Sequence, residues 1–211
     1  MDSKQIIGLI VFCLLFSPLA CNSYKADKHY RQGVEYQKNG KINKAMREFV
    51  HVVHYDPTHI NAHLCLATLY ESQGLLEKAI VEYKNTIRLD PTMVEAHYKL
   101  GAIYSQLKKW GEAVQHYERV IDINSDFAEA YYNLGCIYKK QKEVNKAICV
   151  YRRAIENNPN FFEAHYCLSL IYYVEGRFEL ARKHAEIAEK NYPSAQKLIA
   201  LIEEETMRSK G

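Results

Sequence analysis

The sequence contains few residues that interrupt regular structure, because its 211 residues include only five prolines and nine glycines. Such a composition argues against a loop-rich or all-β protein, and the 48% hydrophobic content is sufficient for a core. There is no excess of one charge either, since the net charge is +3 and basic and acidic residues are interspersed along the chain. We therefore favour helices and expect no nucleic-acid partner.

Motifs for catalysis, cofactors and metals are also missing. The sequence has no glycine-rich phosphate loop, nucleophile elbow or isolated pair of acids. Its six cysteines form no Cys-x-x-Cys pair and do not stand beside histidines at zinc-ligand spacing. We therefore expect no enzyme activity, cofactor, metal site or small-molecule substrate. The last four cysteines are interpreted as small apolar packing residues: Cys65, Cys136, Cys149 and Cys167.

Residues 1–20 resemble a secretory signal peptide. Ile6 to Phe16 is an almost unbroken apolar run, and polar residues begin at Asn22. An apolar stretch of about 15 residues is shorter than the roughly 20 that a transmembrane helix needs, so a permanent anchor is the weaker interpretation.

The end of this segment, Leu19-Ala20-Cys21, resembles the lipobox of bacterial lipoproteins. In that motif a small residue precedes the cysteine that receives lipid and becomes the new N-terminus. The resemblance implies lipid attachment at Cys21 and a membrane protein of the bacterial cell envelope that faces the periplasm. Pro18 departs from the motif, which usually has leucine there. Simple cleavage after Ala20, which would give a secreted protein, and retention as an anchor are the alternatives.

A period of 34 residues runs through the rest of the chain. Four prolines lie 34 or 68 residues apart: Pro57, Pro91, Pro159 and Pro193. Alanines keep the same spacing at Ala45, Ala79, Ala113, Ala147 and Ala181, and tyrosines keep it at Tyr36, Tyr70, Tyr104, Tyr138 and Tyr172. Copies without insertions predict a repeat protein. Each copy also shows apolar residues three and four apart, which indicates two helices.

The motif His97-x-x-Leu100-Gly101-x-x-Tyr104 with Ala113-x-x-x-Tyr117 resembles the tetratricopeptide repeat. The resemblance implies an all-α solenoid of helix-turn-helix repeats. The expected repeats are 26–59, 60–93, 94–127, 128–161 and 162–195, after a signal peptide at 1–20 and a short tether at 21–25. Residues 196–211 should form a capping helix with Leu198, Leu201 and Ile202 on its apolar side.

Two local features support this architecture. Small residues such as Gly101 and Gly135 are expected where two helices approach closely. The residues after each proline position are good helix N-caps, and three of them precede a glutamate at capping-box spacing. These predicted N-caps are Thr58, Thr92, Asp126, Asn160 and Ser194, with Glu95, Glu129 and Glu163 as the capping-box partners.

In tetratricopeptide proteins the first helix of each repeat lines a concave surface. This resemblance implies a partner-binding groove at Tyr30, Tyr98, Lys99, Tyr132, Asn133, Lys139, Tyr166 and Tyr173. Tyrosines offer flat apolar area with a polar tip, which suits capture of a peptide or helix. The alternative is that they only pack against neighbouring repeats. His63, His97 and His165 recur at an aromatic position of the repeat, so we expect them to pack rather than bind metal.

The sequence therefore predicts a membrane-tethered adaptor that binds a protein or peptide. Lipidated tetratricopeptide proteins that assist type IV pilus secretin assembly, or that scaffold cell-wall hydrolases, look similar in organisation. A non-catalytic subunit of an enzyme complex and a soluble secreted or cytosolic adaptor or co-chaperone are the alternatives. The co-chaperone is disfavoured because the position of the family's clamp asparagine holds Val34, Thr68, Ala102, Cys136 and Leu170.

Overall fold

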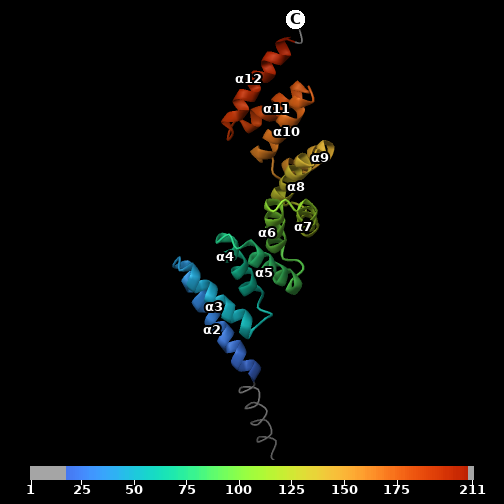
Figure 1. The fold of residues 1–211 in the computed structure, drawn as a ribbon. Helices are drawn as coiled ribbons and strands as arrows, with labels where there is room; N and C mark the ends of the chain where they lie inside the picture. The colour runs from blue at the N-terminus through green and yellow to red at the C-terminus, as the bar shows by residue number, and fades with distance from the viewer. Residues whose placement is uncertain (1–17, 209–211) are drawn as a thin grey trace, which may run out of the picture. The chain divides into compact units, whose positions relative to one another are not determined.

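The computed structural model describes residues 18–208, which fold into eleven α-helices without any strand in that range (Figure 1). The helices are α2 (Pro18–Lys38), α3 (Ile42–Tyr55), α4 (Ile60–Ser72), α5 (Leu76–Leu89), α6 (Val94–Gln106), α7 (Trp110–Ile123), α8 (Ala128–Lys140), α9 (Val144–Asn157), α10 (Phe162–Val174), α11 (Phe178–Ala188) and α12 (Pro193–Arg208). The prediction of an all-α helical repeat fold is confirmed.

The chain divides into two compact units, one ending at Lys99 and the other beginning at Leu100. In the first unit α2 packs on α3, α3 on α4, and α4 on α5. In the second unit each helix from α7 to α11 packs on the helix that follows it. Consecutive helices therefore form stacked hairpins inside each unit, which is how repeats bury apolar faces that no single hairpin could cover.

The alanines at the 34-residue spacing occupy the closest contacts between helices. All five of them are 0% exposed: Ala45, Ala79, Ala113, Ala147 and Ala181. A Cβ atom on Gly135 would lie 2.5 Å from the Tyr151 ring, and one on Gly101 would lie 2.9 Å from the Tyr117 ring. The expectation that these glycines mark close helix approaches is confirmed, since any larger residue would collide with a buried tyrosine.

The turn between the two helices of each repeat uses a left-handed residue. Gly40, Gly74 and Gly176 have φ values of 68°, 71° and 71°, and Lys108 and Lys142 hold the equivalent position at 58° and 63°. Left-handed backbone ends a helix readily at glycine, but it is strained by about 1 to 2 kcal/mol at residues that carry a Cβ.

The links between repeats are built differently from the predicted N-caps. Asp56 Oδ1 accepts hydrogen bonds from Thr58 N at 3.0 Å and from Thr58 Oγ1 at 2.6 Å, and Asp90 does the same for Thr92. These bonds from Thr58 and Thr92 lower the pKa of both aspartates. Such Asx turns engage the residue that we predicted to cap the next helix.

The predicted N-caps are consequently wrong. The N-caps lie one residue later, at His59, Phe127 and Phe161, and of these three only His59 accepts a bond from its own helix, at Ala62 N. The predicted capping-box glutamates instead lie in the first helical turn, where they complement the helix dipole: Glu95, Glu129 and Glu163. Ser194 lies inside α12.

Both ends differ in detail from the sequence-based expectation. Residues 21–25, predicted as a tether, continue helix α2, because no proline or glycine interrupts the chain between Leu19 and Gln32. In α12, Leu198 and Ile202 are buried as expected, but Leu201 is 47% exposed and does not belong to the apolar side.

Almost all of the predicted signal peptide lies outside the described residues. Within 18–208, no helix has the length and apolar character required to cross a membrane.

Candidate functional site

The predicted groove residues lie on the first helices of the repeats. Tyr30 stands on α2 and Tyr98 and Lys99 on α6, all three in the first unit. Tyr132, Asn133 and Lys139 stand on α8 and Tyr166 and Tyr173 on α10, in the second unit. Lys139 is exposed, and the other seven residues are partly buried. Each unit therefore presents its own row of partly exposed side chains along its first helices.

In the first unit these side chains are already held by neighbours. The Tyr30 ring centroid lies 4.6 Å from that of His59 and 5.8 Å from that of Phe49. Burial and then the neighbouring Cys65 raise the pKa of Tyr30. The Tyr30 ring is thus positioned by packing before any partner arrives.

A charged pair lies on the same face of the first unit. Lys99 Nζ is 3.4 Å from Glu71 Oε1, and Glu71 Oε2 accepts a 2.6 Å hydrogen bond from the Tyr83 hydroxyl. Burial and this bond raise the pKa of Tyr83, so Tyr83 remains a donor throughout the physiological range. Tyr83 fixes Glu71, and Glu71 in turn orients Lys99.

In the second unit every predicted tyrosine packs against another aromatic ring. Tyr132 lies 5.2 Å from Phe161 between ring centroids, and Tyr173 lies 5.9 Å from Phe178. Tyr166 stacks on Tyr192 at 5.4 Å with an interplanar angle of 10°. Packing against neighbours and partial exposure therefore occur together, because each ring uses one part of its surface for each.

Sequence reasoning missed the residues that hold this row. Phe161 and Tyr192 come from the links that precede α10 and α12, and their positions just before a helix were the available signal.

Cys167 is buried, in agreement with the packing interpretation, but Cys149 is exposed, so that interpretation is wrong for Cys149. Cys136 is partly buried and accepts a hydrogen bond from the Tyr151 hydroxyl at 3.5 Å.

The recurring histidines are structural. His63, His97 and His165 are 5%, 7% and 4% exposed, so their predicted packing role is confirmed. Each uses Nε2 to donate to the carbonyl oxygen of the proline six residues earlier, at 3.1 to 3.3 Å. No cluster of three or more metal-ligating side chains is found in the part of the chain that the structure describes.

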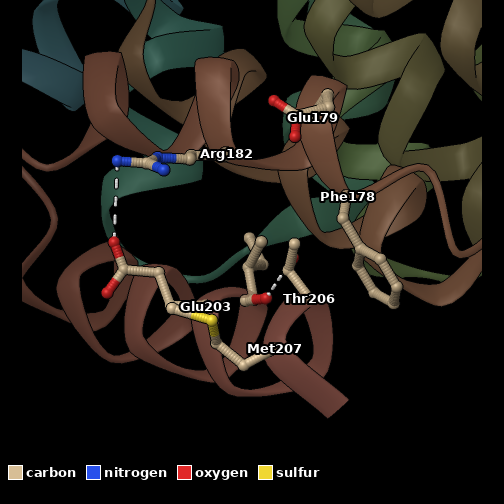
Figure 2. Close-up of a pocket in the computed structure, with 7 residues that line it drawn as sticks. Phe178, Glu179, Arg182, Glu203, Thr206 and Met207 are labelled. Atoms are coloured by element: carbon tan, nitrogen blue, oxygen red, sulfur yellow. Dashed lines mark hydrogen bonds and ion pairs between the residues drawn. The ribbon is translucent and has the colours of Figure 1, made fainter. Parts of the chain in front are cut away.

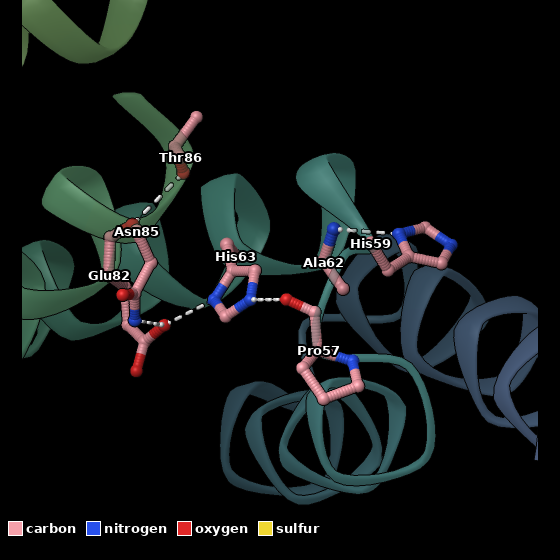
Figure 3. A network of polar contacts seen from close by, with 7 residues as sticks. All are labelled: Pro57, His59, Ala62, His63, Glu82, Asn85 and Thr86. Carbon is pink, nitrogen blue, oxygen red and sulfur yellow. Dashed lines mark hydrogen bonds and ion pairs between the residues drawn. The ribbon is translucent and has the colours of Figure 1, made fainter. Parts of the chain in front are cut away.

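The second ring nitrogen distinguishes two of these histidines. His63 Nδ1 lies 2.6 Å from Glu82 Oε2, which also accepts a bond from Asn85 (Figure 3). Burial alone would lower the pKa of His63, but the Glu82 and Pro57 hydrogen bonds raise it above its usual value. His165 Nδ1 instead lies 2.9 Å from His184 Nδ1, and burial lowers the pKa of both rings, to about 4 for His184.

A depression of about 370 Å³ lies between α11 and the final helix (Figure 2). Arg182 spans its rim, with ion pairs to Glu186 at 2.8 Å and to Glu203 at 3.6 Å. Phe178 and Ile202 supply apolar lining, and Met207 is 75% exposed at its edge. The Arg182–Glu203 pair connects α12 to α11, whereas the Arg182–Glu186 pair lies within α11. The depression is therefore part of the cap, and it shares Phe178 with the tyrosine row, since Phe178 also packs on Tyr173.

Comparison with known proteins agrees with the geometry. The family described as "TPR repeat" matches residues 69–108 and 101–142, and two described as "Tetratricopeptide repeat" match 128–161 and 150–183. A crystal structure of MamA superposes with a TM-score of 0.71 at 30% identity, covering 78% of this chain and 96% of that one. The chain belongs to the tetratricopeptide-repeat family.

Two more distant structures share the fold. Pseudomonas aeruginosa pilF aligns with a TM-score of 0.68 at 16% identity, covering 89% of this chain and 92% of that one. YrrB, described as a TPR protein with an unusual peptide-binding site, aligns with a TM-score of 0.69 at 15% identity, covering 83% and 90%. Among curated proteins, none matches the sequence.

Proposed function

We propose that this protein is an adaptor that captures a peptide or helix of a partner protein on the first-helix face, while a lipid on Cys21 holds it in a bacterial cell envelope. Its membership of the tetratricopeptide family supports a protein-interaction scaffold. The observation that carries the proposed site is the row Tyr132, Tyr166 and Tyr173, in which each ring is braced by another aromatic ring and remains partly exposed.

Braced tyrosines make an efficient contact surface. A ring that is already packed on one side loses little conformational freedom when a partner covers the other side, so less of the binding free energy is lost to ordering. Exposed Lys139 and partly buried Asn133 on α8 add a cation and an amide beside the rings. The preferred ligand is therefore an apolar or aromatic segment that also carries a carboxylate or backbone carbonyls.

The tether part of the proposal rests on the sequence of residues 1–21 and on their place in the chain. Cys21 to Lys25 are all exposed, and Ala26, which follows them, is buried. Five helical residues span about 8 Å, so a lipid on Cys21 would keep the first repeat close to the bilayer. Acyl chains contribute about 0.8 kcal/mol per buried CH2, which favours stable attachment when several chains are present. Partners would then be proteins of an envelope complex, such as a type IV pilus secretin or a cell-wall hydrolase assembly.

The binding face can be tested by photocrosslinking in bacterial cells. A benzophenone amino acid at Lys139 on α8 should capture a partner, which mass spectrometry identifies. The matched control places it at Lys146 on α9, where the lysine side chain is 62% exposed. Equal capture at both positions would show that the first-helix face is not the binding surface.

The identified partner then allows an affinity test. Tyr132→Ala with Tyr166→Ala should weaken binding by roughly 100-fold, because two braced anchors are lost. Tyr24→Ala, which removes a 72% exposed tyrosine from α2, should leave affinity unchanged. Circular dichroism must show unchanged helicity in both variants. Unchanged affinity in a folded double variant would exclude the proposed groove.

Lipidation is tested separately by intact mass and membrane fractionation of wild type and Cys21→Ser. The expected wild type has lost its leader, carries acyl chains and sediments with membranes, whereas Cys21→Ser does none of these. Identical behaviour of the two proteins would contradict the proposed lipid tether. It would not bear on the proposed binding face.

A further inference from the structure

A second depression of about 380 Å³ lies in the second unit and is lined by residues of α9, α10 and α11. Three exposed cations reach it from separate segments: Arg152 of α9, Arg177 of the turn before α11, and Lys183 of α11. Among the described residues that line it, Glu156 alone is acidic. The lining therefore carries an excess of positive charge, which attracts anions.

Neighbouring ion pairs do not remove this excess. Glu156 already pairs with Arg153 at 3.0 Å, and Arg153 lies outside the lining. No ion pair to Arg152 or Lys183 is found within residues 18–208. After burial and the adjacent histidine, these two cations lower the pKa of the partly buried His184 ring in the same lining, so their charges act inside the depression. Two cations without a carboxylate partner thus line one cavity.

The third cation is held in place by its neighbours. The Arg177 guanidinium carbon lies 4.5 Å from the centroid of the Tyr172 ring, and Nη1 lies 3.2 Å from Glu175 Oε2. A guanidinium has five N–H donors in a planar fork, so the Glu175 pair leaves donors that match the two oxygens of another carboxylate. Ile155 and Leu180 add partly buried apolar surface to the lining. Cations and apolar surface together suit a carboxylate on a short methylene stem.

Repeats one and two hold a carboxylate where this depression has a histidine. Glu48 Oε2 lies 2.7 Å from His29 Nδ1, and Glu82 Oε2 lies 2.6 Å from His63 Nδ1. Both glutamates also line a depression on their own repeat. At the 34-residue spacing their equivalent in repeat five is His184, which faces another histidine ring at 2.9 Å. The first two repeats therefore supply their own anion at this position, whereas repeat five lacks it and gathers cations.

We infer that the depression lined by Arg152, Arg177 and Lys183 is a second binding site, which takes glutamate or aspartate side chains from an acidic segment of a partner protein. One carboxylate pairs with the stacked guanidinium of Arg177, and the charges of Arg152 and Lys183 attract a second. The ligand's methylene groups cover Ile155 and Leu180. The site is built mainly from second helices, so it does not rest on the proposed first-helix face.

The test titrates the full chain with an acetylated and amidated hexaglutamate peptide at low ionic strength, by calorimetry. Arg152→Gln with Lys183→Gln should weaken binding by about ten-fold, because two cations without internal partners are lost. The matched control, Arg119→Gln with Lys146→Gln, removes the same charge from exposed residues of the same unit that have carboxylate partners. It should change affinity by less than about two-fold. Equal weakening in both double variants, or no binding to wild type, would overturn the inference.

A third variant gives repeat five the carboxylate of repeat two. His184→Glu places an internal anion beside His165 and the cations, so it should abolish hexaglutamate binding while circular dichroism shows unchanged helicity. Wild-type affinity in this folded variant would contradict the assigned site. Inorganic phosphate that binds more tightly than the peptide would contradict the assigned ligand.

Nuclear magnetic resonance near pH 7 locates the bound peptide. The ring signals of His184 should shift on addition of hexaglutamate, whereas those of His63, which already has Glu82 as its partner, should not. Tyr132→Ala with Tyr166→Ala should bind hexaglutamate as wild type does, so failure of one binding face is distinguishable from failure of the other. Shifts confined to residues outside the depression would exclude it as the acidic-segment site.

Discussion

Repeats two and five hold a histidine at the same position with the same first contact, yet in opposite charge environments. His63 and His165 both donate from Nε2 to a proline carbonyl, at 3.1 and 3.2 Å. A carbonyl oxygen can only accept, so Nε2 carries a proton in both rings. The partner of Nδ1 then decides whether that nitrogen is protonated as well. Glu82 can only accept, so it requires a second N–H on His63 and stabilises the imidazolium. His184 Nδ1 can donate or accept, and burial favours the neutral form of His165, whose Nδ1 then accepts from His184.

The comparison separates two kinds of information in a repeat sequence. The repeat pattern fixes where the ring packs, and the residue 19 positions later fixes its charge. Core volumes differ as well, because fully buried Tyr83 of repeat two has Ala185 as its counterpart in repeat five. One fold thus accommodates different chemistry at equivalent positions.

The largest expected effect comes from replacing Tyr83 of repeat two by alanine, the residue type at the equivalent position of repeat five, Ala185. Tyr83→Ala removes a 0% exposed ring and its bond to Glu71, and should lower the free energy of unfolding by about 3 to 5 kcal/mol. Tyr83→Phe loses only the hydroxyl and should cost about 1 kcal/mol. Urea unfolding followed by circular dichroism measures both. Equal losses in the two variants would mean that the ring volume is not what repeat two depends on.

Acid should destabilise repeat five by up to about 3 kcal/mol. The pKa of His184 is lowered to about 4, first by burial and then by His165, Lys183 and Arg152. A lowered pKa in the folded state means that stability is complete above the unfolded value of about 6.5 and is lost as pH falls from there towards 4. Hydrogen exchange of α10 and α11 amides at pH 7, 5.5 and 4 measures the loss. His184→Gln should remove most of this dependence; an unchanged slope would assign it to other groups.

The opposite pH dependence is expected at His63. Its raised pKa stabilises the folded state fully below about pH 6.5, and this stability is lost as pH rises through the folded-state value. Glu82→Gln should therefore cost about 1 to 2 kcal/mol at pH 5.5 and clearly less at pH 9. Urea unfolding at the two pH values provides the test. A cost independent of pH would indicate a packing role for Glu82 rather than a charge role.

The smallest expected effect concerns a feature that the two repeats share. Gly74 and Gly176 both have φ of 71°, so alanine at either position should cost about 1 kcal/mol. Lys142→Gly should stabilise the fold by a similar amount, because Lys142 adopts the same left-handed conformation with a Cβ. Thermal unfolding measures all three. Unequal losses at the two glycines would show that the turn, too, depends on its repeat.

The sequence was sufficient for the features that repeat. Its 34-residue period gave the helical hairpins, the buried alanines and the close approach at Gly135, because those positions depend on packing inside one repeating unit. It was insufficient where two local interactions compete. Thr58 is a good N-cap by residue type, but Asp56 two residues earlier forms an Asx turn with it and delays the helix to Ile60.

The candidate site was predictable in part for the same reason. The repeat resemblance located Tyr132 and Tyr166 on first helices, but not the rings that brace them, since Phe161 and Tyr192 belong to irregular links. The Tyr151 hydroxyl that donates to Cys136 comes from the next helix, α9, and leaves no pattern in the sequence.

The histidine bond to the preceding proline carbonyl has a mechanical consequence. It joins the first helix of a repeat to the link before it, across six residues of chain. A force that pulls on the link must therefore break this hydrogen bond before it can separate the link from the helix. The link and the helix should then unfold together. In a protein loaded along its chain, extension would advance in steps of whole hairpins.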